Sequence, residues 1–183
     1  MSNFFKETDI DISQAEAIVT ETLKNCDDGE LYLENHKSES IVLDDNKIKS
    51  STYNSDQGYG FRAVTGEVVA YSHSNDISKE SLRKSSENLK DTLKSKKGTY
   101  NHEIPKTNNK YYENINPIES KTFDSKIDLL NSVNNYLRSK GSIVNQVTAN
   151  FLGEHKSIEI IRSDNQILKD DRPLVRDSTF PLF

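Results

Sequence analysis

Two tight-turn signals inside an alternating stretch, between residues 42 and 73, constrain the fold more than any other feature of this sequence. Asp45-Asn46 and Thr65-Gly66 each separate two extended runs, and Asn, Asp and Gly tolerate the left-handed backbone that a two-residue hairpin needs. Before the second turn, apolar side chains occupy every second position, which is the period of a strand. These side chains are Tyr59, Phe61 and Ala63. The stretch therefore predicts an antiparallel β-meander.

A two-layer α+β domain is expected around this meander, over residues 1–98. Residues 30–36 alternate as well, so we expect four or five short antiparallel strands between residues 30 and 73, each with one apolar face. A sheet with one apolar face needs a covering layer. Helical periodicity predicts this cover before and after the meander, in helices at about 13–26 and 78–97.

Both predicted helices carry start signals. Ser13 and Glu16 have the spacing of a capping box, with Ser13 as the N-cap, and Asp76 or Ser78 can cap the second helix. Cys26 lies on the apolar stripe of the first helix, where either a small core residue or a reactive thiol fits. The outer face of the second helix is basic, which is typical of a solvated surface or of a patch for an acidic partner.

A linker is expected over residues 99–120, because Pro105 and Pro117 bracket a stretch with few aliphatic side chains. Residues 121–183 are expected to form a second, central domain that begins with a helix at about 124–140. The sequence after this helix predicts a meander of short strands.

The predicted meander of the second domain has a turn at Gly153-Glu154 and a hairpin signal at Asp164-Asn165. Its strands are expected at 143–152, 158–161, from 166 and from 172. Because the last strands have no neighbours, we expect a truncated helix-plus-β-meander domain with open edges. The complete fold expected is α+β, with a two-layer antiparallel sheet and flanking helices followed by this truncated domain.

Several short segments share one family pattern when their order and spacing are taken together. They are Gly29-Glu30-Leu31-Tyr32, Val42-Leu43-Asp44, Ile48-Lys49, Asp56-Gln57-Gly58-x-Gly60-x-Arg62-Ala63, Thr65-Gly66-Glu67, Asp76-Ile77-Ser78 and Asp171-Arg172-Pro173-Leu174-Val175-Arg176. In this order they resemble the N-terminal portion of the TldD/PmbA family, most closely its TldD branch, over roughly residues 10–176. The resemblance implies a cytosolic bacterial metallopeptidase subunit that acts on flexible peptides.

The matched positions are expected to have structural roles. These family-motif positions are Asp56, Gln57, Gly58, Gly60, Arg62, Arg172, Pro173 and Arg176. Asp56 and Gln57 are expected to make a turn before Gly58 through side-chain to backbone bonds, and the glycines to mark a tight bend or a bulge. Arg62 can bind a peptide carboxylate, stack on a partner, or form a structural salt bridge to Asp56 or Glu67.

The resemblance does not extend to a metal site. Complete family members resemble HExxxH metallopeptidases, in which two imidazoles bind zinc and the Glu acts as general base. This chain has four histidines and none stands in that motif, so zinc is expected only in a complete family member. His102-Glu103 lacks the second histidine of such a motif. His36 and His73 form a ligand pair only if their strands lie close together.

Composition narrows the remaining classes of function. The formal charge of −5 disfavours nucleic acid as a partner, since phosphate binding relies on basic charge. The sequence contains neither a membrane-spanning run nor a secretory signal after Met1, and its single cysteine fits a reducing cytoplasm. We therefore expect a cytoplasmic chain with neither nucleic-acid nor membrane partners.

The function expected is that of an N-terminal fragment or split subunit of a TldD-like metalloprotease. In this role the chain supplies a scaffold and dimerisation part without catalytic residues or metal of its own. Its expected partner is another TldD/PmbA-type chain or the missing C-terminal portion. The alternative is a stand-alone protein-binding module with no peptidase role.

Overall fold

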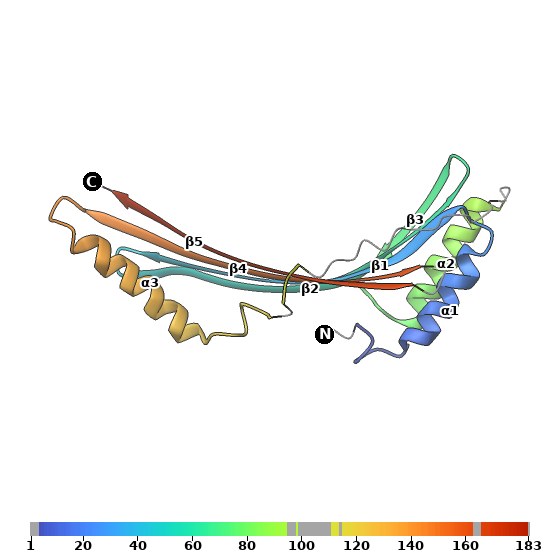
Figure 1. Cartoon of the computed structure of the whole chain (residues 1–183), viewed down its shortest axis with the longest axis horizontal. Helices are drawn as coiled ribbons and strands as arrows, with labels where there is room; N and C mark the ends of the chain where they lie inside the picture. The colour runs from blue at the N-terminus through green and yellow to red at the C-terminus, as the bar shows by residue number, and fades with distance from the viewer. Residues whose placement is uncertain (1–3, 95–97, 99–110, 114, 163–165, 183) are drawn as a thin grey trace. The chain divides into compact units, whose positions relative to one another are not determined.

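A computed structural model describes residues 4–94, 98, 111–113, 115–162 and 166–182 of the chain. Over these residues the strands form one five-stranded antiparallel sheet in the order β3-β2-β1-β4-β5, with helices packed against it (Figure 1). The elements are α1 (Ile12–Leu23), β1 (Asp28–Asp44), β2 (Lys47–Thr65), β3 (Val68–Ser74), α2 (Lys79–Leu93), α3 (Phe123–Arg138), β4 (Gln146–Arg162) and β5 (Ile167–Leu182). This architecture confirms the α+β class.

The contacts divide the chain into two units that are not contiguous in sequence. Unit 1 comprises residues 1–35, 56–111 and 157–170, and unit 2 comprises residues 36–55, 112–156 and 171–183. Four strands, β1, β2, β4 and β5, contribute residues to both units. The sequence instead places one domain at 1–98 and another at 121–183. Most of the predicted linker, residues 99–110 and 114, lies outside the described residues.

The strands are fewer and longer than the sequence predicted. Residues 28–74 form three strands rather than four or five, and β2 alone has 19 residues. The two predicted turns are confirmed: Asp45 and Asn46 have φ values of 47° and 66°, and Gly66 has a φ of 59°. The third expected turn, at Asp56-Gln57, is wrong, because both residues lie inside β2.

The predicted turn at Gly153-Glu154 is also wrong, since β4 continues through both residues. Gly153 does not have a positive φ; it is buried, and a Cβ at this position would lie 3.2 Å from side-chain atoms of both Ile118 and Phe151. The glycine therefore makes room for neighbouring side chains. The expected strands from 166 and from 172 are likewise one strand, β5. Asp164-Asn165 lies outside the described residues.

Side-chain caps set the starts of the helices. The N-cap of α1 is Asp11, two residues before the predicted Ser13. The Asp11 side chain accepts a hydrogen bond from the Gln14 backbone N–H, and the Gln14 side-chain oxygen accepts one from the Asp11 backbone N–H, so this pair replaces the expected Ser13 and Glu16. Ser78 caps α2, as one of the two predicted alternatives. Thr122 caps α3.

The core of unit 1 lies between its helices and one face of its strands. α1 and α2 pack side by side against the sheet (Figure 1). The largest fully buried apolar side chains here are Val19, Leu23, Leu31, Leu33, Phe61, Leu82, Leu89 and Ile161. Cys26 is buried among them, and burial raises the pKa of its thiol, so the core alternative holds and the reactive one does not.

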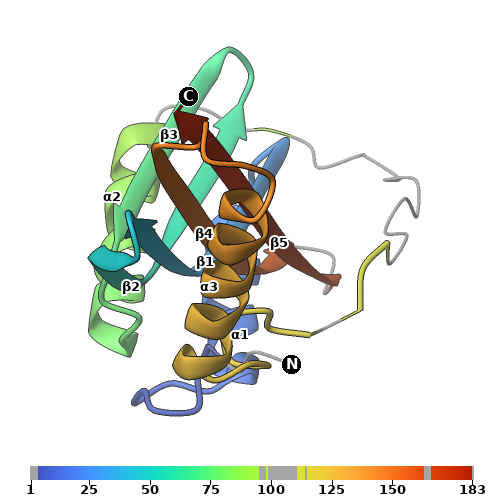
Figure 2. The ribbon, with the colours of Figure 1, turned by 90° about the vertical axis from the view of Figure 1, so that its left-hand side faces the viewer.

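Unit 2 has a smaller core beneath α3, which lies across strands of the sheet in Figure 2. Leu130 and the partly buried Ile127 pack on a cluster of side chains from β1 and β4, namely Ile41, Leu43, Ala149 and Phe151. A buried ion pair adds to this contact: Lys126 Nζ donates to Glu39 and, at 2.7 Å, to the Ile118 carbonyl. No helix formed by the described residues is both long enough and apolar enough to cross a membrane.

Candidate functional site

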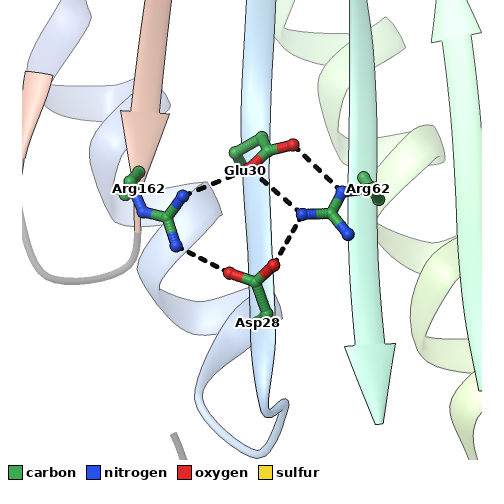
Figure 3. Close-up of polar contacts among 4 residues, drawn as sticks. All are labelled: Asp28, Glu30, Arg62 and Arg162. Carbon is green, nitrogen blue, oxygen red and sulfur yellow. Dashed lines mark hydrogen bonds and ion pairs between the residues drawn. The ribbon is translucent and has the colours of Figure 1, made fainter. Parts of the chain in front are cut away.

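Arg62 lies in a ring of four charged residues in unit 1, which we call the charge cluster: Asp28, Glu30, Arg62 and Arg162 (Figure 3). Arg62 Nη2 donates to Asp28 Oδ2 at 2.6 Å, and its Nε donates to Glu30 Oε1 at 3.0 Å. Arg162 mirrors these contacts, with Nη2 2.6 Å from Asp28 Oδ1 and Nη1 3.3 Å from Glu30 Oε2. The cluster therefore links β2, β1 and β4, which are neighbours in the sheet.

Strand alternation puts this cluster on the sheet face opposite the helices. Phe61 and Ala63 are buried in the core of unit 1, so Arg62 between them points the other way. The four side chains are partly shielded, from 12% exposure for Arg162 to 35% for Arg62. Burial alone would raise the pKa of Asp28, but hydrogen bonds from Arg62 and Arg162 outweigh it and lower that pKa.

These contacts fit a structural clamp better than a catalytic or ligand site. Each oxygen of Asp28 and of Glu30 accepts from a guanidinium, and the positive and negative charges balance. A carboxylate held ionised in this way is a poor general acid or base near neutral pH. The predicted salt bridge of Arg62 is confirmed in kind, but its partners are Asp28 and Glu30 and not Asp56 or Glu67.

Sequence reasoning missed Arg162, which is 100 residues away from Arg62 in the chain. One signal was available, because Arg162 follows the buried Ile161 at the end of an alternating run, just as Arg62 follows Phe61. That pattern shows on which face of its strand Arg162 lies, but not which strand lies beside it. Only the sheet order, with β1 between β2 and β4, brings the two arginines to the same carboxylates.

The two motif glycines lie where β3 and the residues at its end come close to β2. Gly60 pairs with His73, and a Cβ on Gly60 would lie 2.6 Å from Tyr71 Oη. A Cβ on Gly58 would lie 2.8 Å from the Ser74 carbonyl oxygen. Neither glycine has a positive φ. The Ser74 carbonyl leaves no room for a side chain on Gly58, whereas at Gly60 the Tyr71 ring would have to move.

The remaining motif residues of β2 make few contacts. Asp56 and Gln57 are exposed on the strand, and Gln57 Oε1 accepts from Asn35 Nδ2 at 3.5 Å. Their expected side-chain to backbone turn is therefore absent from this segment, which is extended throughout.

The downstream motif residues Arg172, Pro173 and Arg176 lie in β5. The carbonyls of Gln166 and Leu182, near the two ends of the strand, accept from the amides of Arg162 and Asn145 on the β4 side. Along a strand, alternate residues direct their backbone groups to the same side. The even-numbered residues of β5 therefore direct theirs to β4, and the backbone nitrogens of the odd-numbered Pro173 and Pro181 face the outer edge. Proline is tolerated there because that edge requires no amide donor from it.

Asp44 of unit 2, in the Val42-Leu43-Asp44 motif, is another carboxylate whose two oxygens are both held by side chains. Its Oδ1 accepts from Gln146 Nε2 and Thr148 Oγ1, both at 2.8 Å, and its Oδ2 lies 3.2 Å from Lys49 Nζ. Hydrogen bonds from Gln146, Thr148 and Lys49, in that order, lower the pKa of Asp44. This motif residue therefore joins the β1–β2 hairpin to β4.

The histidines do not assemble into a metal site in the described part of the chain. His36 Nε2 lies 3.7 Å from Glu154 in unit 2, whereas His73 stacks on Tyr71 in unit 1, with ring centroids 5.8 Å apart. His155 is buried 4.0 Å from Asp171, and burial lowers its pKa. The described residues contain no group of three or more His, Cys, Asp and Glu side chains able to hold a metal. His102 lies outside them.

Comparison with known proteins places the sequence within a family of peptidases. Residues 29–94 match the family described as PmbA/TldA metallopeptidase domain 1. The chain is 33% identical over 156 residues to the "Metalloprotease TldD homolog" of Buchnera aphidicola subsp. Acyrthosiphon pisum (strain APS) and 34% identical over 159 residues to that of Haemophilus influenzae. These matches cover 85% and 84% of this chain, but 32% of each relative, so the chain spans about a third of their length.

Solved structures share the fold at low sequence identity. A putative modulator of DNA gyrase from Bacteroides thetaiotaomicron superposes with a TM-score of 0.67 at 14% identity, covering 91% of this chain and 40% of that one. A second, from Thermotoga maritima, gives 0.67 at 12% identity, covering 84% and 38%. TldE from Thermococcus kodakarensis gives 0.57 at 11% identity, covering 93% and 40%.

Proposed function

Because the chain belongs to the TldD/PmbA family, we propose that it serves as the non-catalytic N-terminal part of a TldD-like metallopeptidase that acts on flexible peptides. The observation that carries the proposal is that residues 29–94 match domain 1 of the family, while this sequence contains no HExxxH motif. About 85% of this chain aligns with the first relative, and the aligned part is 32% of that relative. The catalytic residues are then proposed to lie in another part of such a protein.

The residues of this chain do not fit the zinc ion that the family name implies. Its sequence has four histidines and no HExxxH motif, and the described residues contain no cluster of metal-ligating side chains. The carboxylates of the charge cluster are all bound by arginine, so they do not replace the missing ligands. The catalytic step of such a peptidase is therefore proposed to take place outside this chain.

The role proposed for the chain is that of a scaffold. The charge cluster and the Asp44 contacts each join strands that are far apart in sequence, and both involve residues of the family motif. In unit 2 several large apolar side chains remain exposed, including Leu174, Phe180 and Leu182 of β5. Exposed apolar side chains of this kind suit contact with another TldD/PmbA-type chain or with the C-terminal portion, in the cytoplasm.

Co-purification tests this proposal. The chain is co-expressed with the C-terminal two thirds of a TldD homolog that carries HExxxH, and each is also expressed alone. We expect the two to co-purify, and a flexible fluorogenic peptide to be cleaved by the pair and not by this chain alone. Metal analysis should find zinc in the pair and no stoichiometric zinc in the isolated chain.

Two results would overturn the proposal. One is about one zinc per isolated chain that disappears in the His36→Ala/His73→Ala variant. The other is failure to associate with the C-terminal portion of several TldD-type relatives, together with stable capture of an unrelated protein. That second result would favour the stand-alone binding module.

A further inference from the structure

β2 has an open outer edge along its first half. In the sheet order β3 is the outer neighbour of β2, but the register of the two strands runs only from Tyr59 to Thr65 (Figure 1). Residues 47–57 of β2 are all exposed, on both faces of the strand. Within unit 2, residues 47–55 thus have no outer strand beside them among the described residues.

The turn that precedes this edge sets the direction of its backbone groups. Asp45 and Asn46 have φ values of 47° and 66°, as in a type I′ hairpin, and this turn makes Asp44 and Lys47 a hydrogen-bonded pair. Positions that face the partner strand alternate with positions that face away from it. Because Lys47 faces β1, Ile48, Ser50 and Thr52 direct their N–H and C=O groups away from β1. The edge therefore presents a row of donors and acceptors in extended geometry.

The opposite edge of the sheet carries prolines, and this edge does not. β5 carries Pro173 and Pro181, whose missing donors face outward. β2 contains no proline, and residues 50–55 carry no charge. Lys47 and Lys49 stand at the beginning of this edge, but residues 50–55 lack the prolines and charged side chains that usually prevent strand addition.

From this contrast we propose that β2 residues 47–55 bind an extended peptide by antiparallel strand addition, with the acidic end of the peptide at its C-terminus. Backbone hydrogen bonds supply most of the recognition. Antiparallel pairing brings the C-terminal end of the peptide to Lys47, where β2 begins. No ion pair of Lys47 is found within the described chain, whereas Lys49 already contacts Asp44. This edge would be a binding site for the flexible peptides of the proposed function. The inference rests on that function only where it identifies those peptides as the ligands met in the cell.

Fluorescence anisotropy with a defined peptide tests the inference on the full chain. The probe is a labelled, capped nine-residue peptide of alternating threonine and valine that ends in aspartate. Thr52→Pro removes an outward N–H, whereas Thr52→Val keeps it and changes only the side chain; Ser50→Pro and Ser50→Ala form a second matched pair. We expect each proline variant to weaken binding about tenfold or more, and each control to stay within about twofold.

A second set of probes tests the direction of binding without altering the strand. Moving the aspartate to the N-terminus of the peptide should weaken binding several-fold, and Lys47→Gln should abolish this difference. A third set of peptides is N-methylated either at the odd-numbered or at the even-numbered residues. Only one of these two peptides should lose binding, because only every second N–H of the peptide points to β2. The protein is unchanged in this test, so it holds even where a proline variant fails to fold.

The absence of saturable binding, equal binding by the proline and control variants, or equal effects of both methylation phases would each overturn the inference. None of these results bears on co-purification with a C-terminal peptidase portion, so failure of this inference is distinguishable from failure of the proposed function.

Discussion

Replacing Arg62 by methionine tests whether the charge cluster holds the sheet of unit 1 together. Arg62 donates to Asp28 at 2.6 Å and to Glu30 at 3.0 and 3.3 Å, so the substitution removes three charge-assisted contacts. Arg162 still binds both carboxylates, and water reaches side chains that are 30% and 24% exposed. We therefore expect a loss of about 1–2 kcal/mol, less than for a fully buried pair.

For a chain of this size that loss corresponds to a fall in the thermal midpoint of about 2–8 °C. Circular dichroism during thermal and urea unfolding measures it, and hydrogen exchange of β1 residues 28–35 localises it. Arg62→Lys, which keeps the charge but not the planar fork, should lose less. A variant with all four members neutral, in which Asn replaces Asp28, Gln replaces Glu30 and Met replaces both arginines, should recover most of the lost stability, because no buried charge is then left unpaired. An Arg62→Met chain that unfolds at the wild-type midpoint would refute the clamp.

The cluster also predicts how stability depends on pH. The pKa of Asp28 is lower in the folded chain than in the unfolded one, so its contribution to stability is complete above the unfolded pKa of about 4. It is lost as pH falls from there through the lower folded pKa. In acid titrations the Asp28→Asn variant should show a flatter loss of stability below about pH 4 than the wild type; parallel curves would contradict this.

The other predictions concern packing, a buried ion pair and local stability. Gly58→Ala should cost about 1–3 kcal/mol, because its Cβ would lie 2.8 Å from the Ser74 carbonyl, whereas Gly66→Ala meets no atom within 4 Å and should cost only about 1 kcal/mol of backbone strain; thermal midpoints compare them. Lys126→Met should cost about 3–5 kcal/mol in urea unfolding by leaving Glu39 buried without a partner, and adding Glu39→Gln should restore part of it. In hydrogen exchange of the isolated chain, residues 143–152 should exchange faster than residues 59–71, because unit 2 has the smaller core; equal, slow exchange would argue against this.

Sequence patterns predicted the parts of this fold that depend on neighbours in the chain. The turns at Asp45-Asn46 and at Gly66 follow from left-handed backbone preferences, which act within two or three residues. Alternation likewise placed Phe61 in the core and Arg62 on the opposite face. The Ser78 cap is equally local.

The wrong predictions share a cause in contacts between distant segments. Gly153 was predicted in a turn and Gly58 just after one, but both lie inside strands. A Cβ on Gly58 would lie 2.8 Å from the Ser74 carbonyl oxygen, and a Cβ on Gly153 would lie 3.2 Å from side-chain atoms of Phe151. At such positions glycine is compatible with a turn or with a strand, and the contact with neighbouring segments determines which of the two forms. Short strands were therefore predicted where long ones form.

By itself the sequence determined the helices, the two hairpin turns, the family and the absence of an HExxxH motif, because each is written in adjacent or regularly spaced residues. Only the tertiary structure decided that Asp28 and Glu30 bind Arg62 and Arg162 together, and that β2 has an open edge beside residues 47–55. Both depend on strand order and register. Order and register arise when segments tens of residues apart pair through backbone hydrogen bonds, which any sequence can make.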